Sequence, residues 1–133
     1  IFGIGMAIVT FRKSNKIKAA EIFMNLELNF REHIPILLDI EYEINYSNKI
    51  AKAIKAVEAK NAQDDDDKVI LQLDSMLRHF HTCVFIKKLN VDNSTLNQAY
   101  SHYLRYFVKE DRPELVRYVR WYWPSVYKWA ENL

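Results

Sequence analysis

Glycine is almost absent from this chain, and its absence is the strongest constraint on what the chain can fold into. Of the 133 residues only Gly3 and Gly5 are glycine. Phosphate-cradling P-loops and dinucleotide-binding turns need glycine, and so do most tight hairpin turns. Because half of the residues are hydrophobic, the chain can nevertheless bury a core. We therefore predict an all-α fold, an antiparallel bundle of five to seven helices.

The first eleven residues, IFGIGMAIVTF, form an apolar run in which only Thr10 is polar, and Arg12, Lys13, Lys16 and Lys18 follow it. An apolar run closed by basic residues is typical of a transmembrane helix at its cytoplasmic end. A complete span needs about 20 apolar residues, so we expect residues 1–13 to be the end of a truncated transmembrane helix. Residues 14–133 would then be a single soluble helical domain, anchored to the inner membrane and facing the cytoplasm. The alternative is a buried N-terminal helix of a purely soluble protein.

Apolar residues recur with helical spacing along the rest of the chain, and prolines mark the breaks. The spacing predicts helical stretches up to about residue 33 and over residues 36–46, 50–57, 69–89, 96–107 and 113–133. Pro35 and Pro124 are expected to kink or split the chain. Ser47 or Asn48, and further on Asp111, are expected to cap helix starts. The segment IEYEINY, residues 40–46, also alternates apolar and polar side chains, which leaves a β-strand open as an alternative there.

The segment HFHTC, residues 79–83, gathers residue types that bind metals or act as nucleophiles. On a helix His79 and Cys83 would share a face, whereas His81 would point elsewhere. A zinc site needs three or four converging ligands, and no further ligand stands at a recognisable spacing. A catalytic cysteine needs a base and an oxyanion-stabilising group, and this glycine-poor sequence offers no loop for the latter. We therefore predict that the protein is not an enzyme, binds no metal or cofactor, and buries Cys83 in its core.

The C-terminal segment has an unusual density of aromatic and basic residues. It contains all three tryptophans of the chain, and one helical face cannot bury every aromatic side chain in it. Aromatic and arginine side chains dominate the binding energy of protein interfaces. We therefore predict that this segment binds a protein partner or a second copy of the chain, with the contact residues Arg117, Arg120, Trp121, Trp123 and Trp129.

Three other roles for this segment stay open: packing in the core, contact with a membrane surface, and stacking on the bases of single-stranded nucleic acid. Base stacking uses the same residue types, so a single-stranded nucleic-acid-binding module is our alternative function. The formal net charge of +2 gives no general electrostatic case for nucleic acid. Nucleic acid is therefore the less favoured partner.

The order of the segments resembles a known kind of protein. The stretch VILQLDSMLRHFHTCVFIKKLNVDNSTLNQAYSHYLRYF, residues 69–107, follows the apolar run, its basic exit and a charged amphipathic helix. This order resembles the uncharacterised bacterial families of small membrane-anchored helical proteins, in which an apolar helix is followed by a short polar turn and a helix rich in Tyr and Phe. The resemblance implies a membrane-anchored topology and a bacterial source. It brings no catalytic residues.

Overall fold

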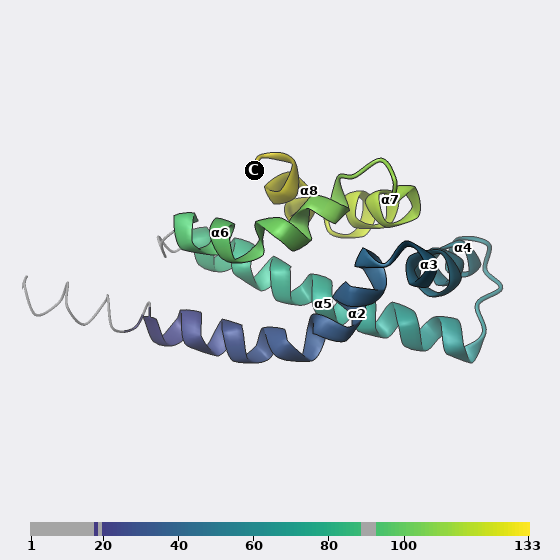
Figure 1. Ribbon diagram of the computed structural model, residues 1–133, viewed down its shortest axis with the longest axis horizontal. Helices are drawn as coiled ribbons and strands as arrows, with labels where there is room; N and C mark the ends of the chain where they lie inside the picture. The colour runs from purple at the N-terminus through teal and green to yellow at the C-terminus, as the bar shows by residue number, and fades with distance from the viewer. Residues whose placement is uncertain (1–17, 19, 89–92) are drawn as a thin grey trace, which may run out of the picture.

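Helices make up almost all of the chain that the computed structural model describes (Figure 1). The described residues are 18, 20–88 and 93–133, and none of them forms a β-strand. Within these ranges the predicted all-α fold is confirmed, and the number of helices is about six. The apolar run 1–11 and most of its basic exit lie outside the described residues. No helix of the described part is both long enough and apolar enough to span a membrane.

An N-terminal helix over residues 20–30 is followed by α-helices and by short 3-10 or π-helical segments, which are labelled η. In chain order these are η1 (Arg31–His33), α2 (Ile34–Glu41), α3 (Glu43–Asn45), η2 (Tyr46–Ala51), α4 (Lys52–Glu58), α5 (Asp64–Lys88), α6 (Asn93–Leu104), η3 (Arg105–Phe107), α7 (Pro113–Tyr122) and α8 (Pro124–Glu131). The segment η2 is π-helical and joins α3 to α4. The four helices α2, α3, α4 and α5 thus follow one another with few intervening residues.

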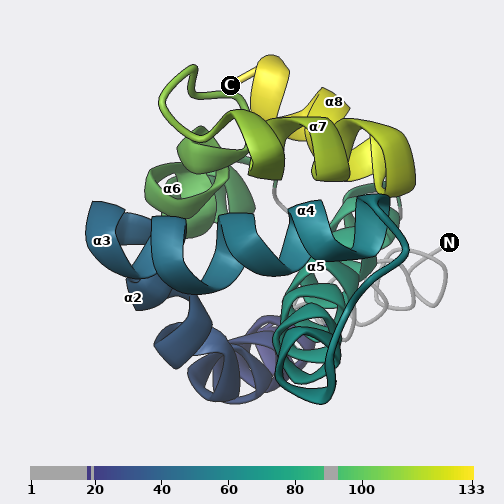
Figure 2. The same cartoon turned by 90° about the vertical axis from the view of Figure 1, so that its right-hand side faces the viewer.

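Helix α5 is the longest helix of the described chain and the centre of its packing. Its side chains Leu73, Met76, Leu77, Phe80 and Cys83 are fully buried. The N-terminal helix runs antiparallel alongside α5 (Figure 1). Helix α4 crosses α5, and α7 lies beside α4 in a similar orientation (Figure 2). The predicted antiparallel bundle is therefore not confirmed as a description of the whole set of helices.

The start of α5 agrees with the helical stretch predicted there, except that the four aspartates 64–67 belong to the helix. They form its first turn, where the positive end of the helix dipole favours carboxylates. One carboxylate oxygen of Asp66 also accepts a hydrogen bond from the backbone N–H of Gln63 at 3.0 Å. The acidic run is thus an N-terminal cap for the central helix.

The region between the N-terminal helix and α4 differs most from the prediction. Pro35 lies in the first turn of α2, and the chain changes direction there, as predicted. The extended backbone of Tyr42 (φ −82°, ψ 114°) then ends α2. Beyond Tyr42 the chain stays helical through η2, so the predicted cap at Ser47 or Asn48 is wrong. The β-strand alternative for residues 40–46 is also wrong.

Helix α7 begins and ends at prolines, as predicted. Pro113 occupies its first turn, but the residue in the N-cap position is Arg112 and not Asp111. Pro124 opens α8 and separates it from α7. Leu115 and Val119 before this break and Val126 and Trp129 after it are buried, whereas the ring of Tyr122 at the break is exposed.

Candidate functional site

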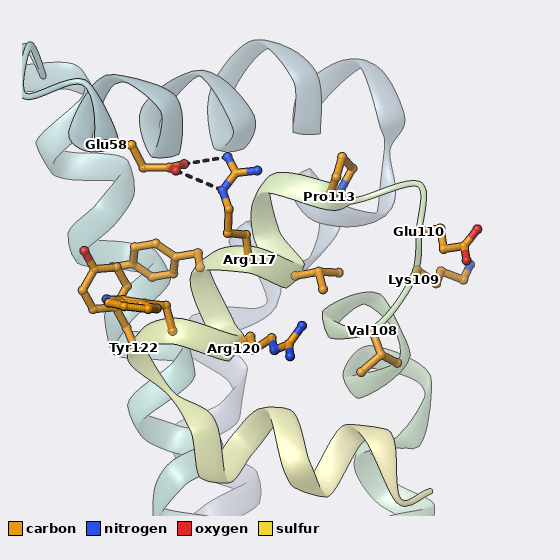
Figure 3. Close-up of a pocket in the computed structure, with 11 residues that line it drawn as sticks. Glu58, Val108, Lys109, Glu110, Pro113, Arg117, Arg120 and Tyr122 are labelled. Atoms are coloured by element: carbon orange, nitrogen blue, oxygen red, sulfur yellow. Dashed lines mark hydrogen bonds and ion pairs between the residues drawn. The ribbon is translucent and has the colours of Figure 1, made fainter.

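The outer side of α7 carries an open hollow with a volume of about 1030 Å³ (Figure 3). Three parts of the chain line it: the end of α4, the turn that precedes α7, and α7 itself. Its lining residues are Glu58, Val108, Lys109, Glu110, Pro113, Val116, Arg117, Tyr118, Arg120, Trp121 and Tyr122. The hollow combines aromatic, aliphatic and basic side chains with two acidic ones.

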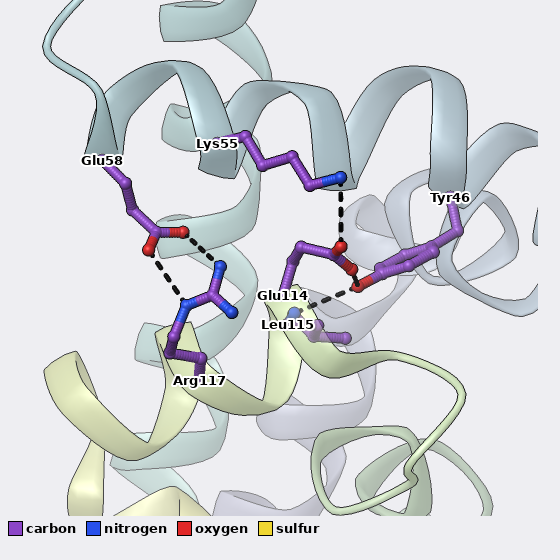
Figure 4. A network of polar contacts seen from close by, with 6 residues as sticks. All are labelled: Tyr46, Lys55, Glu58, Glu114, Leu115 and Arg117. Carbon is purple, nitrogen blue, oxygen red and sulfur yellow. Dashed lines mark hydrogen bonds and ion pairs between the residues drawn. The ribbon is translucent and has the colours of Figure 1, made fainter.

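A polar network fixes the N-terminal end of α7 against η2 and α4 (Figure 4). The Tyr46 hydroxyl donates to Oε2 of Glu114 at 2.7 Å and accepts from the backbone N–H of Leu115 at 3.1 Å. Nζ of Lys55 lies 3.3 Å from Oε1 of Glu114. Burial opposes ionisation of Glu114, but hydrogen bonds from Tyr46, its own backbone and Lys55 outweigh this effect and lower its pKa. The carboxylate that positions α7 is therefore ionised at neutral pH.

A second contact joins α7 to the end of α4 at the edge of the hollow. The Arg117 guanidinium donates two hydrogen bonds to the Glu58 carboxylate, at 2.9 Å from Nε and 2.7 Å from Nη2 (Figures 3 and 4). Both side chains are largely exposed, so the pair contributes at most about 1 kcal/mol to stability. Its geometric effect is to hold Arg117 against α4, whereas the guanidinium carbon of Arg120 lies 5.8 Å from the centroid of the Tyr127 ring.

The aromatic end of the hollow lies where α7 ends. The side chain of Trp121 is 78% exposed. The rings of Tyr118 and Tyr122 are 4.8 Å apart between centroids, and the Tyr118 hydroxyl donates to Asp74 of α5 at 2.6 Å. The exposed Trp121 ring therefore stands on a helix whose inner side is anchored to the core.

Three of the five predicted contact residues, Arg117, Arg120 and Trp121, line this hollow. Trp123 does not line it, because its indole is half-buried and donates to Asp74 at 3.3 Å. Trp129 is 6% exposed, so most of its side chain is packed in the core, and it does not line this hollow. The sequence analysis did not predict two parts of the hollow: the turn 108–110, which directly precedes α7, and Glu58, which is brought to Arg117 from 59 residues earlier.

The predicted separation of the HFHTC side chains is confirmed. His79 is buried, with Nε2 at 3.2 Å from the Tyr100 hydroxyl, whereas His81 is exposed, with Nδ1 at 2.9 Å from the Ser125 hydroxyl. Cys83 is a core residue, as predicted, and burial raises the pKa of its thiol to about 12. A thiol with this pKa is a poor nucleophile at neutral pH. Among the described residues no three His, Cys, Asp or Glu side chains gather at one point where they could hold a metal ion.

The hollow on α7 offers a large exposed indole, two tyrosine rings and two arginines, which are residue types that anchor partner proteins. Comparisons with family models, with curated proteins and with solved structures found no match to this chain.

Proposed function

We propose that this protein is a non-enzymatic helical domain that acts by binding another protein, or a second copy of itself, through the hollow on α7. The observation that carries the proposal is the 78% exposure of Trp121 beside that hollow. A tryptophan left in water forfeits the favourable burial of its large apolar surface. An indole in this position gains that free energy when a partner covers it.

The rigidity of α7 supports the proposal. Glu114 and Arg117 tie its outer turns to η2 and α4, and Tyr118 ties its inner side to α5. Binding to a surface that is already ordered loses less conformational entropy than binding to a mobile one. The hollow is therefore organised for contact before a partner arrives.

The charges around the hollow favour a protein over single-stranded nucleic acid. Of its five charged lining residues, Glu58 and Glu110 are acidic, and Glu58 neutralises Arg117. Proteins that bind single strands instead combine stacking rings with a continuous basic groove for the phosphates. Arg120 and Lys109 alone do not make such a groove.

A Trp121→Ala substitution is expected to weaken binding of the partner by about 30-fold or more, the loss that corresponds to a hot-spot residue of about 2 kcal/mol. A photocrosslinking residue at position 121 identifies the partner in cells that make the protein. The dissociation constant is then measured with the purified partner, or by light scattering when the crosslinked partner is a second copy. Helix content and thermal midpoint stay unchanged, because Trp121 is exposed.

Phe85→Ala is the matched control, because Phe85 is an exposed aromatic residue on α5, outside the hollow. A photocrosslinking residue at position 85 should not give the product seen at position 121. An unchanged dissociation constant for the Trp121→Ala variant would rule out α7 as the contact surface.

We further propose that residues 1–13 hold this domain at a membrane, on the cytoplasmic side of the inner membrane. The apolar run and the four basic residues after it support this topology, as does the resemblance to small membrane-anchored bacterial proteins. A tether of this kind raises the effective concentration of the α7 surface near partners at the same membrane.

A further inference from the structure

A second hollow, with a volume of about 410 Å³, lies where the C-terminal ends of α5 and α8 meet. No acidic side chain is found among the described residues that line it. Its polar and aromatic lining is formed by Lys87, Lys88, Ser125, Lys128, Trp129 and Asn132. Three lysines from two helices thus line one small depression.

Lys87 is held in place by neutral groups. Its Nζ donates to Oδ1 of Asn97 at 3.2 Å and lies 4.6 Å from the centroid of the Trp129 ring. The same Asn97 oxygen accepts from the Trp129 indole N–H at 2.7 Å. Burial lowers the pKa of Lys87, because removal from water disfavours the charged ammonium. An anion that entered the hollow would supply a countercharge to the lysines that line it.

The hollow lies at the end of the molecule from which the N-terminal helix starts. The Phe30 ring is 5.5 Å from His79 and 6.1 Å from Phe80 between centroids, and the helix that ends at Phe30 runs antiparallel to α5 (Figure 1). Both helices rise about 1.5 Å per residue, so residue 20 lies level with the last turn of α5. The first described turns and the lysines 87 and 88 therefore share one end of the fold.

We propose that this lysine-lined hollow binds the phosphate of anionic phospholipid headgroups and so orients the domain on the membrane surface. This inference rests on the proposed tether, which places the start of the N-terminal helix at the membrane. The chemistry that identifies the ligand is a cluster of three lysines with hydroxyl and amide groups beside them and no acidic residue among the described lining. The amide of Asn132 offers a neutral donor to phosphate oxygens, whereas the Ser125 hydroxyl lies 2.9 Å from Nδ1 of His81.

The test measures amine acetylation in the full chain bound to vesicles of phosphatidylcholine alone or of phosphatidylcholine mixed with phosphatidylglycerol. Labelling of Lys87, Lys88 and Lys128 is expected to fall about fivefold in the anionic vesicles, the factor that corresponds to about 1 kcal/mol per lysine at an anionic surface. The exposed lysines Lys52, Lys60 and Lys68 are internal controls, and their labelling should stay the same.

A matched pair of triple variants gives an independent readout. Changing Lys87, Lys88 and Lys128 to Gln should abolish the gain in vesicle binding that phosphatidylglycerol provides, whereas changing Lys52, Lys60 and Lys68 to Gln removes the same charge and should preserve it. Acetylation of the wild-type chain keeps the test decisive even where the first triple variant folds poorly.

The outcomes separate this inference from the tether on which it rests. A chain that sediments with neither kind of vesicle would overturn the tether. A chain that sediments with both kinds, but whose lysines 87, 88 and 128 are labelled equally in both, would overturn the headgroup site alone. Protection by inorganic phosphate added to phosphatidylcholine vesicles, equal to that by phosphatidylglycerol, would identify a soluble phosphate as ligand and overturn the lipid assignment.

Discussion

An Arg112→Met substitution is expected to lower the free energy of unfolding by about 4 kcal/mol. Arg112 is 3% exposed although it carries a full charge. Its Nε donates to the carbonyl oxygen of Ile40 at 2.9 Å and its Nη2 to that of Glu41 at 3.1 Å. These carbonyls belong to the last turn of α2, where no further helical N–H is present to pair with them. Methionine fills a similar volume but leaves both carbonyls without the donor.

Neighbouring groups explain why burial of this arginine is tolerated. Nη1 of Arg112 lies 3.2 Å from Oδ2 of Asp111, and the guanidinium carbon lies 5.0 Å from the Tyr46 ring centroid and 5.6 Å from that of Tyr106. The planar guanidinium thus stacks on aromatic rings while it donates in its own plane, which a lysine ammonium cannot do. We therefore expect Arg112→Lys to recover only part of the lost stability.

The measurement is urea and thermal unfolding followed by circular dichroism. For a chain of this length a loss of about 4 kcal/mol corresponds to a fall of roughly 14 °C in the thermal midpoint. Arg105→Met is the matched control, since Arg105 is an exposed arginine on η3, and its midpoint should change by less than about 2 °C. A midpoint of the Arg112→Met variant within the range of this control would show that the contact with α2 contributes nothing.

The roles of Arg112 and Trp121 illustrate the limit of what the sequence can predict here. Proline positions and apolar spacing are local signals, and they located the starts of α2, α7 and α8 and the buried side of α5. Whether a given charged or aromatic side chain is buried or exposed depends on which distant segment of the chain packs over it. Arg112 is buried because the end of α2, about 70 residues earlier, meets it.

Packing between distant segments also decides which parts of the candidate site can be predicted from the sequence. Trp121 and Trp129 belong to one aromatic segment, yet the break at Pro124 turns α8 so that Trp129 enters the core while Trp121 stays outside. The contribution of Glu58 to the hollow depends on how α4 crosses α5, for which no local pattern exists. The π-helical segment η2 was also missed, because the spacing of Ile50 and Ala53 fits an ordinary helix equally well.

Acidification from pH 7 to pH 5 is expected to lower the free energy of unfolding by about 2 kcal/mol through His79 alone. Burial and, to a smaller extent, the neighbouring His33 together lower the pKa of His79 to about 4. His33 is also buried, and burial lowers its pKa as well. The two rings are 5.5 Å apart between centroids, so protonation of both would place two positive charges side by side.

The sign of the effect follows from proton binding. Well above pH 6.5 His33 and His79 are neutral in both the folded and the unfolded chain, and their contribution to stability is complete. Between pH 6.5 and pH 4 the unfolded chain binds protons that the folded chain does not, so stability falls as the pH falls. Glu114, whose pKa is lowered, adds its own loss only below its ordinary value of 4.5. Between pH 7 and pH 5 the change in the free energy of unfolding therefore comes from His33 and His79 and not from Glu114.

His79→Gln removes the titration of His79 and keeps a side chain that can hydrogen bond to Tyr100, so it should reduce the slope of the stability profile between pH 7 and pH 5 to the part that His33 contributes. The control is His81→Gln on the exposed side of α5, which should leave the slope as it is in the unchanged protein. Denaturant titrations at several pH values measure both slopes. Equal slopes for the two variants would contradict the prediction.

Because His33 lies in η1, where the N-terminal helix meets α2, hydrogen exchange of residues 20–33 is expected to accelerate first as the pH falls. A uniform acceleration along α5, α6 and α7 would instead place the acid sensitivity elsewhere in the fold.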